Sequence, residues 1–463
     1  MIDTASAKTS EFLQLRSDFT DFEHFQGNAS QRAEEKRQFL NDEVYAPQYA
    51  YPRLAEFAFK DDIVALKSNL LEASFGLKHV EKTPEVESQL TYIHSELARI
   101  ALTEAARNMY VMQGFTNYET NSEAFNRRNI EAYGELDYGL SLSMINTEYT
   151  NAFNLVPATN YEQTIKTELL QRINIGEPLN LTEPQILNSS ELDALHQFVL
   201  RRYEDAFSLV PDTDDTVRYN AAQCKAILEQ VLISDGLAEK GWSIVINEES
   251  IIVSTYPKRK IIYIPSNIAY TAEEIRRILI GHEIKAHAWR YENALLTKNQ
   301  TLEEGTAASA DIEEGLGILI ECAISGNLDN PSLDRARDRY ITAGLALGVD
   351  GVKRDAREVY EILWRMFVLR GNSEGGSVED QEAAAKQVAY THIENAFRGT
   401  SFTRKGVIYT KLKIYYEGLI KNAKFFKENI NDIAEAFDVA FIGRYDHTDA
   451  KERQQFSAER SAK

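Results

Sequence analysis

The segment from Gly241 to Ser266 is the one stretch of this chain that predicts β-strands, and it limits the fold more than any other feature. It reads GWSIVINEESIIVSTYPKRKIIYIPS, three short runs rich in β-branched residues that are separated by turn-forming residues. Most of the remaining sequence repeats apolar residues at steps of three and four, which is typical of amphipathic helices. We therefore predict a mainly α-helical protein with one small β-sheet, arranged as a meander.

A helix is expected directly after these strands. Thr271 is followed three residues later by Glu274, a capping box that marks the start of a helix. The same helix carries His282, Glu283 and His287, the residue types of a zinc hydrolase with one residue more than the familiar H-E-x-x-H spacing.

The spacing of the two histidines decides whether they could bind one metal ion. In a regular helix, residues five apart lie about 140° around the axis, so the two imidazoles would point apart. A π-bulge, with i→i+5 hydrogen bonds, would bring them nearly in line. A helix that ends or unwinds at Ala286 would do the same. The simpler alternative is that His282 is a core histidine and His287 a surface one.

A catalytic zinc site also needs a third protein ligand and an open position for water. The segment 312–323 is apolar on nearly all sides, which predicts a buried helix, and it contains Glu313 and Glu314. A buried carboxylate needs a partner, and a zinc ion would provide one. Periodicity slightly favours Glu313 as the inward-facing residue, and a solvated pair of glutamates is the alternative. Glu283 stands where a general base belongs.

Further segments occur in a recognisable order along the chain. They are EAYGELD, HEIKAH, YENALL, LEEG, IEEGLGILIE, LDRARDRYITAGLA, FRGT and GVIYTKLKIYYEGL. This order resembles the tyrosine/phenylalanine carboxypeptidase family, also called the QEGLA-motif family, which includes the microtubule-associated tyrosine carboxypeptidases. The resemblance extends from about Tyr51 to Asn422. It implies a zincin-like metallopeptidase core with a helical N-terminal region.

Carried over residue by residue, the resemblance implies one zinc ion per chain, bound by His282, His287 and Glu314, with Glu283 as general base on zinc-bound water. Glu313 remains the alternative third ligand. The implied activity is hydrolysis of the C-terminal bond of peptides or protein tails, with release of Tyr or Phe. A regulatory pseudoenzyme of the same fold, a zinc endopeptidase and a helical binding protein without metal are the alternatives. The intact set of His282, Glu283 and His287 counts against the pseudoenzyme.

The sequence departs from the family pattern at four positions. Lys285 and Ala286 stand where the family has Gly-Thr, Gly317 stands where it has Ala, and Leu412 stands where it has Asp. None of these changes removes a ligand or the base. The Lys285 change is expected to alter the rim of the cleft, and the Leu412 change puts in doubt any role assumed for the family's Asp.

A carboxypeptidase must hold a free C-terminal carboxylate, which suits the fork of an arginine or the ammonium of a lysine. Each candidate for substrate binding could equally serve in a structural salt bridge or on a helix face. The candidates are Arg398, Lys411, Tyr415, Arg339 and Tyr340. The strand 261–264 is expected to offer an edge to which an extended peptide could add.

The charge of the chain argues against several classes of partner. Lys and Arg number 51 against 71 Asp and Glu, a formal net charge of −20, which disfavours nucleic acid, anionic membranes and the acidic tails of tubulin. The sequence shows neither a signal peptide nor a membrane span. With only two cysteines, Cys224 and Cys322, we expect a cytoplasmic protein. The oligomeric state stays open.

Four regions are expected along the chain. They are a polar N-terminal segment (1–45), a helical N-terminal region (46–210), a zincin-like catalytic region (211–445) and a disordered tail (446–463).

Overall fold

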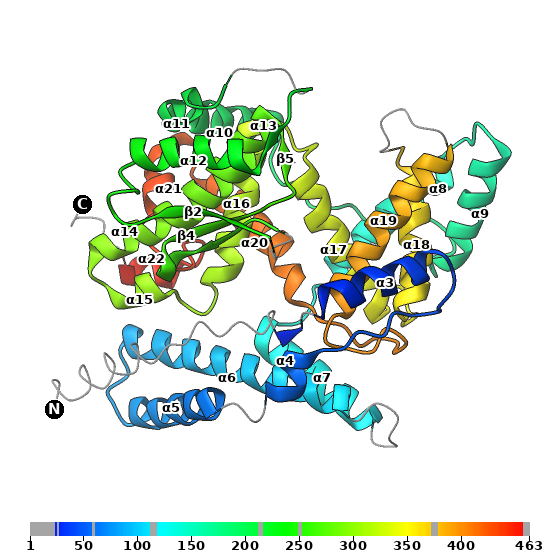
Figure 1. Ribbon diagram of the computed structural model, residues 1–463, viewed down its shortest axis with the longest axis horizontal. Helices are drawn as coiled ribbons and strands as arrows, with labels where there is room; N and C mark the ends of the chain where they lie inside the picture. Colours follow the sequence, from blue (N-terminus) through cyan, green and yellow to red (C-terminus); the bar gives the residue numbers. More distant parts are fainter. Residues whose placement is uncertain are drawn as a thin grey trace. The chain divides into compact units, whose positions relative to one another are not determined.

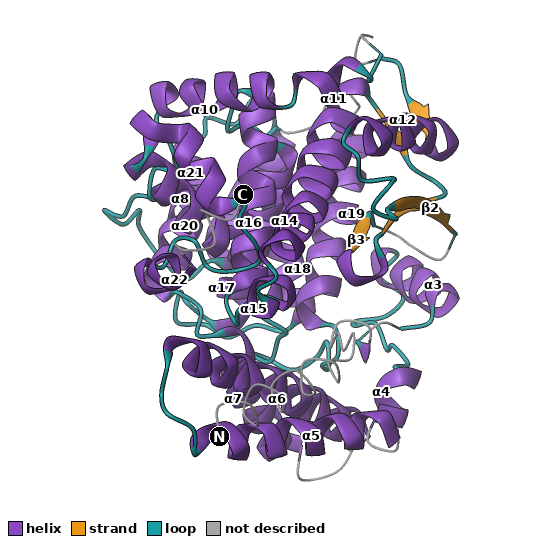
Figure 2. Ribbon diagram, turned by 90° about the vertical axis from the view of Figure 1, so that its left-hand side faces the viewer, coloured by secondary structure: helices purple, strands orange, loops and turns teal. Residues whose placement is uncertain are grey.

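The computed structural model describes residues 24–25, 27–57, 61–111, 118–211, 216–248, 252–371 and 378–456. The structure is mainly helical with small sheets, as predicted (Figure 2). No helix in the described part of the chain is long and apolar enough to cross a membrane. The chain forms two compact units. Figure 1 labels their helices and strands and colours them along the sequence.

Unit 1 comprises Met1–Glu81, Leu90–Pro184 and Ala336–Lys413. Phe39 packs edge-on against Tyr360 and Tyr390 in its core, so the N-terminal segment is tied to helices from much later in the chain. The helices are α3 (Ala29–Leu40), α4 (Pro52–Glu56), α5 (Asp61–Lys78), most of α6 (Pro84–Val111), α7 (Tyr118–Tyr133), α8 (Tyr138–Asn154), α9 (Asn160–Arg172), most of α17 (Pro331–Leu347), α18 (Ala356–Leu369), α19 (Val378–Phe397) and η4 (Lys411–Lys413).

Unit 2 comprises Lys82–Gln89, Gln185–Arg335 and Ile414–Lys463. Its helices are α10 (Ser189–Arg202), α11 (Glu204–Ser208), α12 (Ala221–Ser234), α13 (Ala272–Glu274), η3 (Ile275–Ala288), α14 (Trp289–Thr297), α15 (Gln300–Glu304), α16 (Ser309–Ser325), α20 (Ile414–Glu428), η5 (Ile430–Asp432), α21 (Ile433–Ala440) and α22 (Ala450–Phe456).

The predicted division at residues 210 and 211 differs from these units. Residues 336–413, expected in the catalytic region, belong to unit 1 because α18 packs against α19, α8 and α9, and α19 packs against α3. Unit 2 is therefore assembled from segments on both sides of an inserted helical stretch.

Helix α16 is the buried centre of unit 2 and packs against η3, α10 and α20. Gly315 and Gly418 face each other where α16 crosses α20, and a Cβ atom on either one would overlap the backbone of the other helix. The two backbones can approach this closely only because both positions lack a side chain. The prediction of a buried helix over 312–323 is confirmed.

The three-stranded sheet of unit 2 contains β2 (Ser243–Asn247), β3 (Ser254–Tyr256) and β4 (Ile261–Pro265) in the order β2-β4-β3. β4 pairs in parallel with β2 and antiparallel with β3, so the sheet is not the predicted meander. β3 follows β2 in the sequence but lies on the other side of β4, so β2 and β3 do not pair with each other. β4 is thus the central strand rather than the expected edge, and α12 packs against β2 and β4. A two-stranded sheet, β1 (Tyr219–Asn220) with β5 (Ala269–Tyr270), completes the unit.

The segment predicted as a disordered tail is structured where it is described. Helix α22 ends at Phe456, which is buried with Ala294, Leu302, Ile442 and Tyr445. The side chain of Phe456 packs the helix against an apolar cluster, although the sequence of this segment shows no apolar face. The prediction of disorder is therefore wrong for residues 446–456, and residues 457–463 lie outside the described part.

Candidate metal centre

Helix η3 carries both histidines and is a π-helix over all fourteen of its residues. Its i→i+5 hydrogen bonds place residues five apart on one face, and the ring centroids of His282 and His287 are 4.9 Å apart. Of the alternatives that the sequence left open, the structure has the π-helical one, and it extends well beyond one turn. The capping box of Thr271 and Glu274 opens the preceding turn, also as predicted.

The neighbouring helix α16 supplies the third member of the group. Ligand atoms of His282, His287 and Glu314 all lie within 4.8 Å of one another, so these three side chains could hold a metal ion. Glu314 Oε2 is 3.6 Å from His282 Nε2. The structure thus groups Glu314, rather than Glu313, with the two histidines.

Glu313 occupies a different position beside the same rings. Its Oε1 lies 3.3 Å from His287 Nδ1, and its Oε2 accepts a hydrogen bond of 3.1 Å from Arg444 Nε. The side chain is buried. Periodicity correctly predicted that Glu313 points inward, but its partners are an imidazole and a guanidinium.

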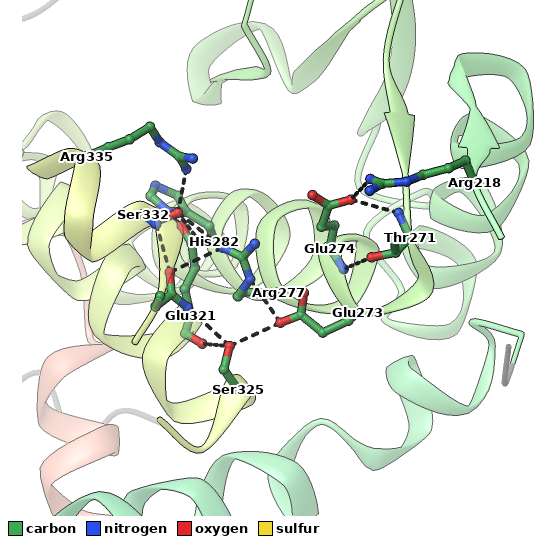
Figure 3. A network of polar contacts seen from close by, with 11 residues as sticks. Arg218, Thr271, Glu273, Glu274, Arg277, His282, Glu321, Ser325, Ser332 and Arg335 are labelled. Carbon is green, nitrogen blue, oxygen red and sulfur yellow. Dashed lines mark hydrogen bonds and ion pairs between the residues drawn. The ribbon is translucent and has the colours of Figure 1, made fainter. Parts of the chain in front are cut away.

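Glu321, two turns after Glu314, contacts the other histidine. Its Oε1 is 2.7 Å from His282 Nδ1, and because a carboxylate only accepts, Nδ1 carries the proton. Figure 3 shows Glu321 between His282, Arg277 and Ser332, with Arg335 donating to Ser332 Oγ at 2.7 Å. His282 is therefore fixed with Nε2 as its available nitrogen.

Glu283 lies next to His282 and is 8% exposed. Its Oε2 accepts a hydrogen bond of 2.6 Å from the hydroxyl of Thr255 in β3. The three-stranded sheet and the histidine helix are thus joined through the side chain that the sequence analysis assigned as general base.

Gly317 allows α16 to lie against the His282 ring. A Cβ atom at this position would be 2.6 Å from ring atoms of His282, well inside van der Waals contact. The lack of a side chain at Gly317 is therefore matched to the position of this ring.

The charges of this cluster shift its pKa values in a consistent way. Burial acts to lower the pKa of His282, but hydrogen bonds with Glu314 and Glu321 outweigh it and raise the pKa well above its ordinary value. The pKa of His287 is likewise raised, because Glu313 outweighs burial. Burial acts to raise the pKa of Glu314, yet the two imidazoles lower it overall. The cluster attracts positive charge, either protons or a cation.

The predicted substrate residues are divided between the two units. Arg398, Lys411, Arg339 and Tyr340 belong to unit 1, whereas Tyr415 belongs to α20 of unit 2. Arg398 is buried and bonds to Asn395, and burial lowers its pKa to about 10. Tyr340 is fully buried, and its hydroxyl accepts a hydrogen bond of 3.1 Å from the amide of Asp137. Arg339, Lys411 and Tyr415 are half-buried.

Lys285 does not form an exposed rim, contrary to expectation. It is buried and donates a hydrogen bond of 2.6 Å to Asp235, which also accepts from Trp289 Nε1 at 3.0 Å. In the π-helix this side chain faces α12 and is part of the packing.

The donor set suits zinc. Two imidazoles and one carboxylate are a common ligand set for a catalytic zinc ion, and ligating histidines usually donate their second N–H to a carboxylate or a carbonyl. His282 meets that second condition through Glu321. The buried Oε1 of Glu313, which has no hydrogen bond, offers the same partner to His287.

Sequence reasoning missed several residues of the site. Glu321 follows Glu314 by seven residues on the same buried helix, and that spacing could have identified it. Arg277 precedes His282 by five residues and shares its face only because the helix is π. Nothing in the local pattern points to Thr255 or Arg444.

We compared the chain with protein-family models, with curated proteins and with solved structures, and found no match in any of the three.

Proposed function

We propose that the protein is a zinc-dependent carboxypeptidase that hydrolyses the C-terminal peptide bond of peptides or protein tails and releases Tyr or Phe. The observation that carries this proposal is the convergence of His282, His287 and Glu314 beside Glu283. Three ligands of this type with an adjacent carboxylate are the parts that a zinc peptidase requires.

Zinc bound by these side chains would lower the pKa of a water molecule toward neutrality and polarise the scissile carbonyl. Glu283 accepts the proton of the attacking water and passes it to the leaving amine. Thr255 holds Glu283 Oε2 through its hydroxyl, which limits the orientations of the carboxylate. Glu321 keeps the proton of His282 on Nδ1, so that Nε2 presents a lone pair.

The arrangement of strands and helix supports a zincin-like core. β3 is one of the two edge strands of the three-stranded sheet, the one whose Thr255 contacts the base. An extended peptide that adds to β3 would run beside Glu283. The substrate strand is thus assigned to β3, since β4 is flanked on both sides.

The direction of cleavage and the preference for aromatic residues rest on the sequence resemblance. A carboxypeptidase needs a cation for the terminal carboxylate, and Arg339, Arg398 and Lys411 remain the candidates. The net charge of −20 disfavours acidic protein tails as substrates, so tubulin is not carried over.

Peptides that differ only in the last residue (Tyr, Phe, Leu or Glu), each as free acid and as amide, test this proposal. We expect single Tyr or Phe residues to be released from the free acids and little release from the amides. Amidation removes the anion and leaves the scissile bond chemically similar, so the pairs isolate carboxylate recognition. Equal cleavage of the amides, or internal cuts, would identify an endopeptidase. No cleavage by zinc-loaded protein would favour the pseudoenzyme.

A further inference from the structure

Each histidine of the site has its own buried glutamate on α16. His282 Nδ1 faces Glu321 at 2.7 Å, and His287 Nδ1 faces Glu313 at 3.3 Å. Both contacts involve the same ring nitrogen, so in both rings Nε2 is the nitrogen left for a ligand bond. The arrangement is therefore paired around the position that the metal would occupy.

Each of these glutamates is in turn held by an arginine. Glu321 pairs with Arg277 of η3 and accepts a hydrogen bond of 2.6 Å from Ser332 Oγ (Figure 3). Glu313 pairs with Arg444, whose Nε is 3.1 Å from Oε2. Two arginines that are distant in sequence thus each pair with the glutamate beside one of the two histidines.

The backbone of Arg444 is held by hydrogen bonds to Leu302 and Thr306. Its amide donates to Leu302 O at 2.9 Å and its carbonyl accepts from Thr306 N at 3.0 Å. The fully buried Arg290 donates hydrogen bonds to two backbone carbonyls near Arg444 in the sequence, that of Tyr445 and that of Ala440, the latter at 3.1 Å. These hydrogen bonds hold the backbone at Arg444 in place and so limit the positions that its guanidinium can take.

Glu313 retains one unused acceptor. Its Oε1 is buried and has no hydrogen bond, although His287 Nδ1 lies 3.3 Å away. A small rotation of the His287 ring would complete this hydrogen bond and fix the imidazole in the tautomer that already holds for His282.

We propose that Glu313 and Glu321 are matched positioning residues, each placed to accept the Nδ1 proton of one imidazole so that Nε2 is presented to the metal, and that Arg444, supplied by the segment 441–449, holds Glu313 for this purpose. This inference rests on the proposed metal site. It makes metal binding depend on the segment 441–449, which is far in sequence from the two histidines. Residues behind metal-bound histidines typically contribute 10- to 100-fold to metal affinity.

Metal affinity tests the inference without reference to catalysis. Zinc affinity is measured by competition with a chromophoric chelator for wild type, Glu313→Ala, Glu321→Ala and the milder Glu313→Gln. The same proteins loaded with Co²⁺ report ligand geometry through their visible absorption. We expect about 10- to 100-fold weaker zinc binding for both alanine variants, a smaller loss for Glu313→Gln, and altered cobalt spectra. Asp438→Ala removes an exposed carboxylate, 3.5 Å from Arg202 in the same unit, and serves as the matched control.

The role of Arg444 is tested by a double-mutant cycle. Arg444→Met should weaken zinc binding in the wild-type background and have little further effect on Glu313→Ala, because it acts through that carboxylate. Additive losses, or variants that bind zinc as tightly as wild type with an unchanged cobalt spectrum, would overturn the positioning role and leave the proposed function intact. A wild-type protein that binds neither metal would overturn both.

Discussion

Two buried clusters of charged side chains, one in each unit, use carboxylates in different ways. In unit 1, Arg337 pairs with Glu148 and Glu183, and Arg370 pairs with Glu148 and Asp338. Arginine stays charged at every relevant pH, so this cluster is a closed set of ion pairs. It ties α8, α17 and α18 together.

In unit 2, three carboxylates of one helix meet two imidazoles instead. Glu314 contacts His282, while Glu313 and Glu321 each divide their two oxygens between a histidine and an arginine. An imidazole can give up its proton, and a guanidinium cannot. The comparison shows that buried carboxylates form fixed ion pairs with arginines in unit 1 and meet titratable imidazoles in unit 2, in a group that could hold a metal ion.

The largest expected effect is a loss of catalytic rate without a loss of structure. Glu283→Gln keeps the shape of the base and removes its proton transfer, so we expect kcat to fall by ~10²–10⁴-fold while zinc content and fold are retained. Peptide turnover and metal analysis on the same preparation measure this. A variant that turns over as fast as wild type would show that Glu283 is not the base.

Breaking the ion pairs of Arg370 in unit 1 should lower the free energy of unfolding and leave the metal content unchanged. Arg370→Met leaves Glu148 and Asp338 without one of their guanidiniums, and breaking a buried pair in this way costs about 3–5 kcal/mol. Thermal unfolding should show this loss. Arg128→Met removes an exposed partner of Glu131 in the same unit and should cost no more than about 1 kcal/mol. If Arg370→Met also lost zinc, the two clusters would not be independent.

The two clusters should also titrate in different pH ranges. Burial raises the pKa of Asp338 to about 6, above its value of 3.8 in an unfolded chain, so its charge destabilises the fold above about pH 6 and stability rises as pH falls toward 4. The pKa values of His282 and His287 are raised above 6.5, so the stabilisation from their protonated forms is full below pH 6.5 and is lost as pH rises through the folded values.

Thermal melts of metal-free and zinc-loaded protein across this range check the assignment. Zinc needs unprotonated imidazoles, so its stabilising effect should grow as pH rises above 6.5. Asp338→Asn should remove only the dependence between about pH 4 and 6. A zinc effect that was equal at all pH values would contradict the histidine site.

The smallest effect concerns one helical glycine in each unit. Gly317→Ala places a methyl group against the His282 ring and should weaken zinc binding by less than Glu321→Ala does. Gly76→Ala in α5 meets nothing within 4 Å and should stabilise its helix by about 0.5–1 kcal/mol with zinc affinity unchanged. Equal zinc affinity in the Gly317→Ala variant would mean that the ring has room to move.

The sequence predicted the parts of unit 2 that depend on local pattern. The capping box and the buried helix with its glutamates follow from spacings within about fifteen residues, whereas the π-helix was only one of the alternatives that the histidine spacing left open. The strand order was missed because the parallel pairing of β2 and β4 depends on a crossover that alternation of residues does not encode.

The residues that contact the site from distant parts of the sequence could not be predicted for the same reason. Arg444 and Thr255 reach the site through tertiary packing, and residues 336–413 join unit 1 through contacts between helices that are distant along the chain. Phe456 anchors the final helix with a single buried ring, which is too little pattern to predict order.

The zinc content of the purified protein decides whether His282, His287 and Glu314 form a metal site. Protein purified without a histidine tag is analysed by plasma mass spectrometry, alongside His282→Ala, Glu314→Ala and Arg337→Met. The account predicts close to one zinc per chain in wild type and in Arg337→Met, and loss of the metal in the other two. Wild-type protein that is free of metal and cannot be reloaded with zinc, or a His282→Ala variant that retains its full zinc content, would contradict it.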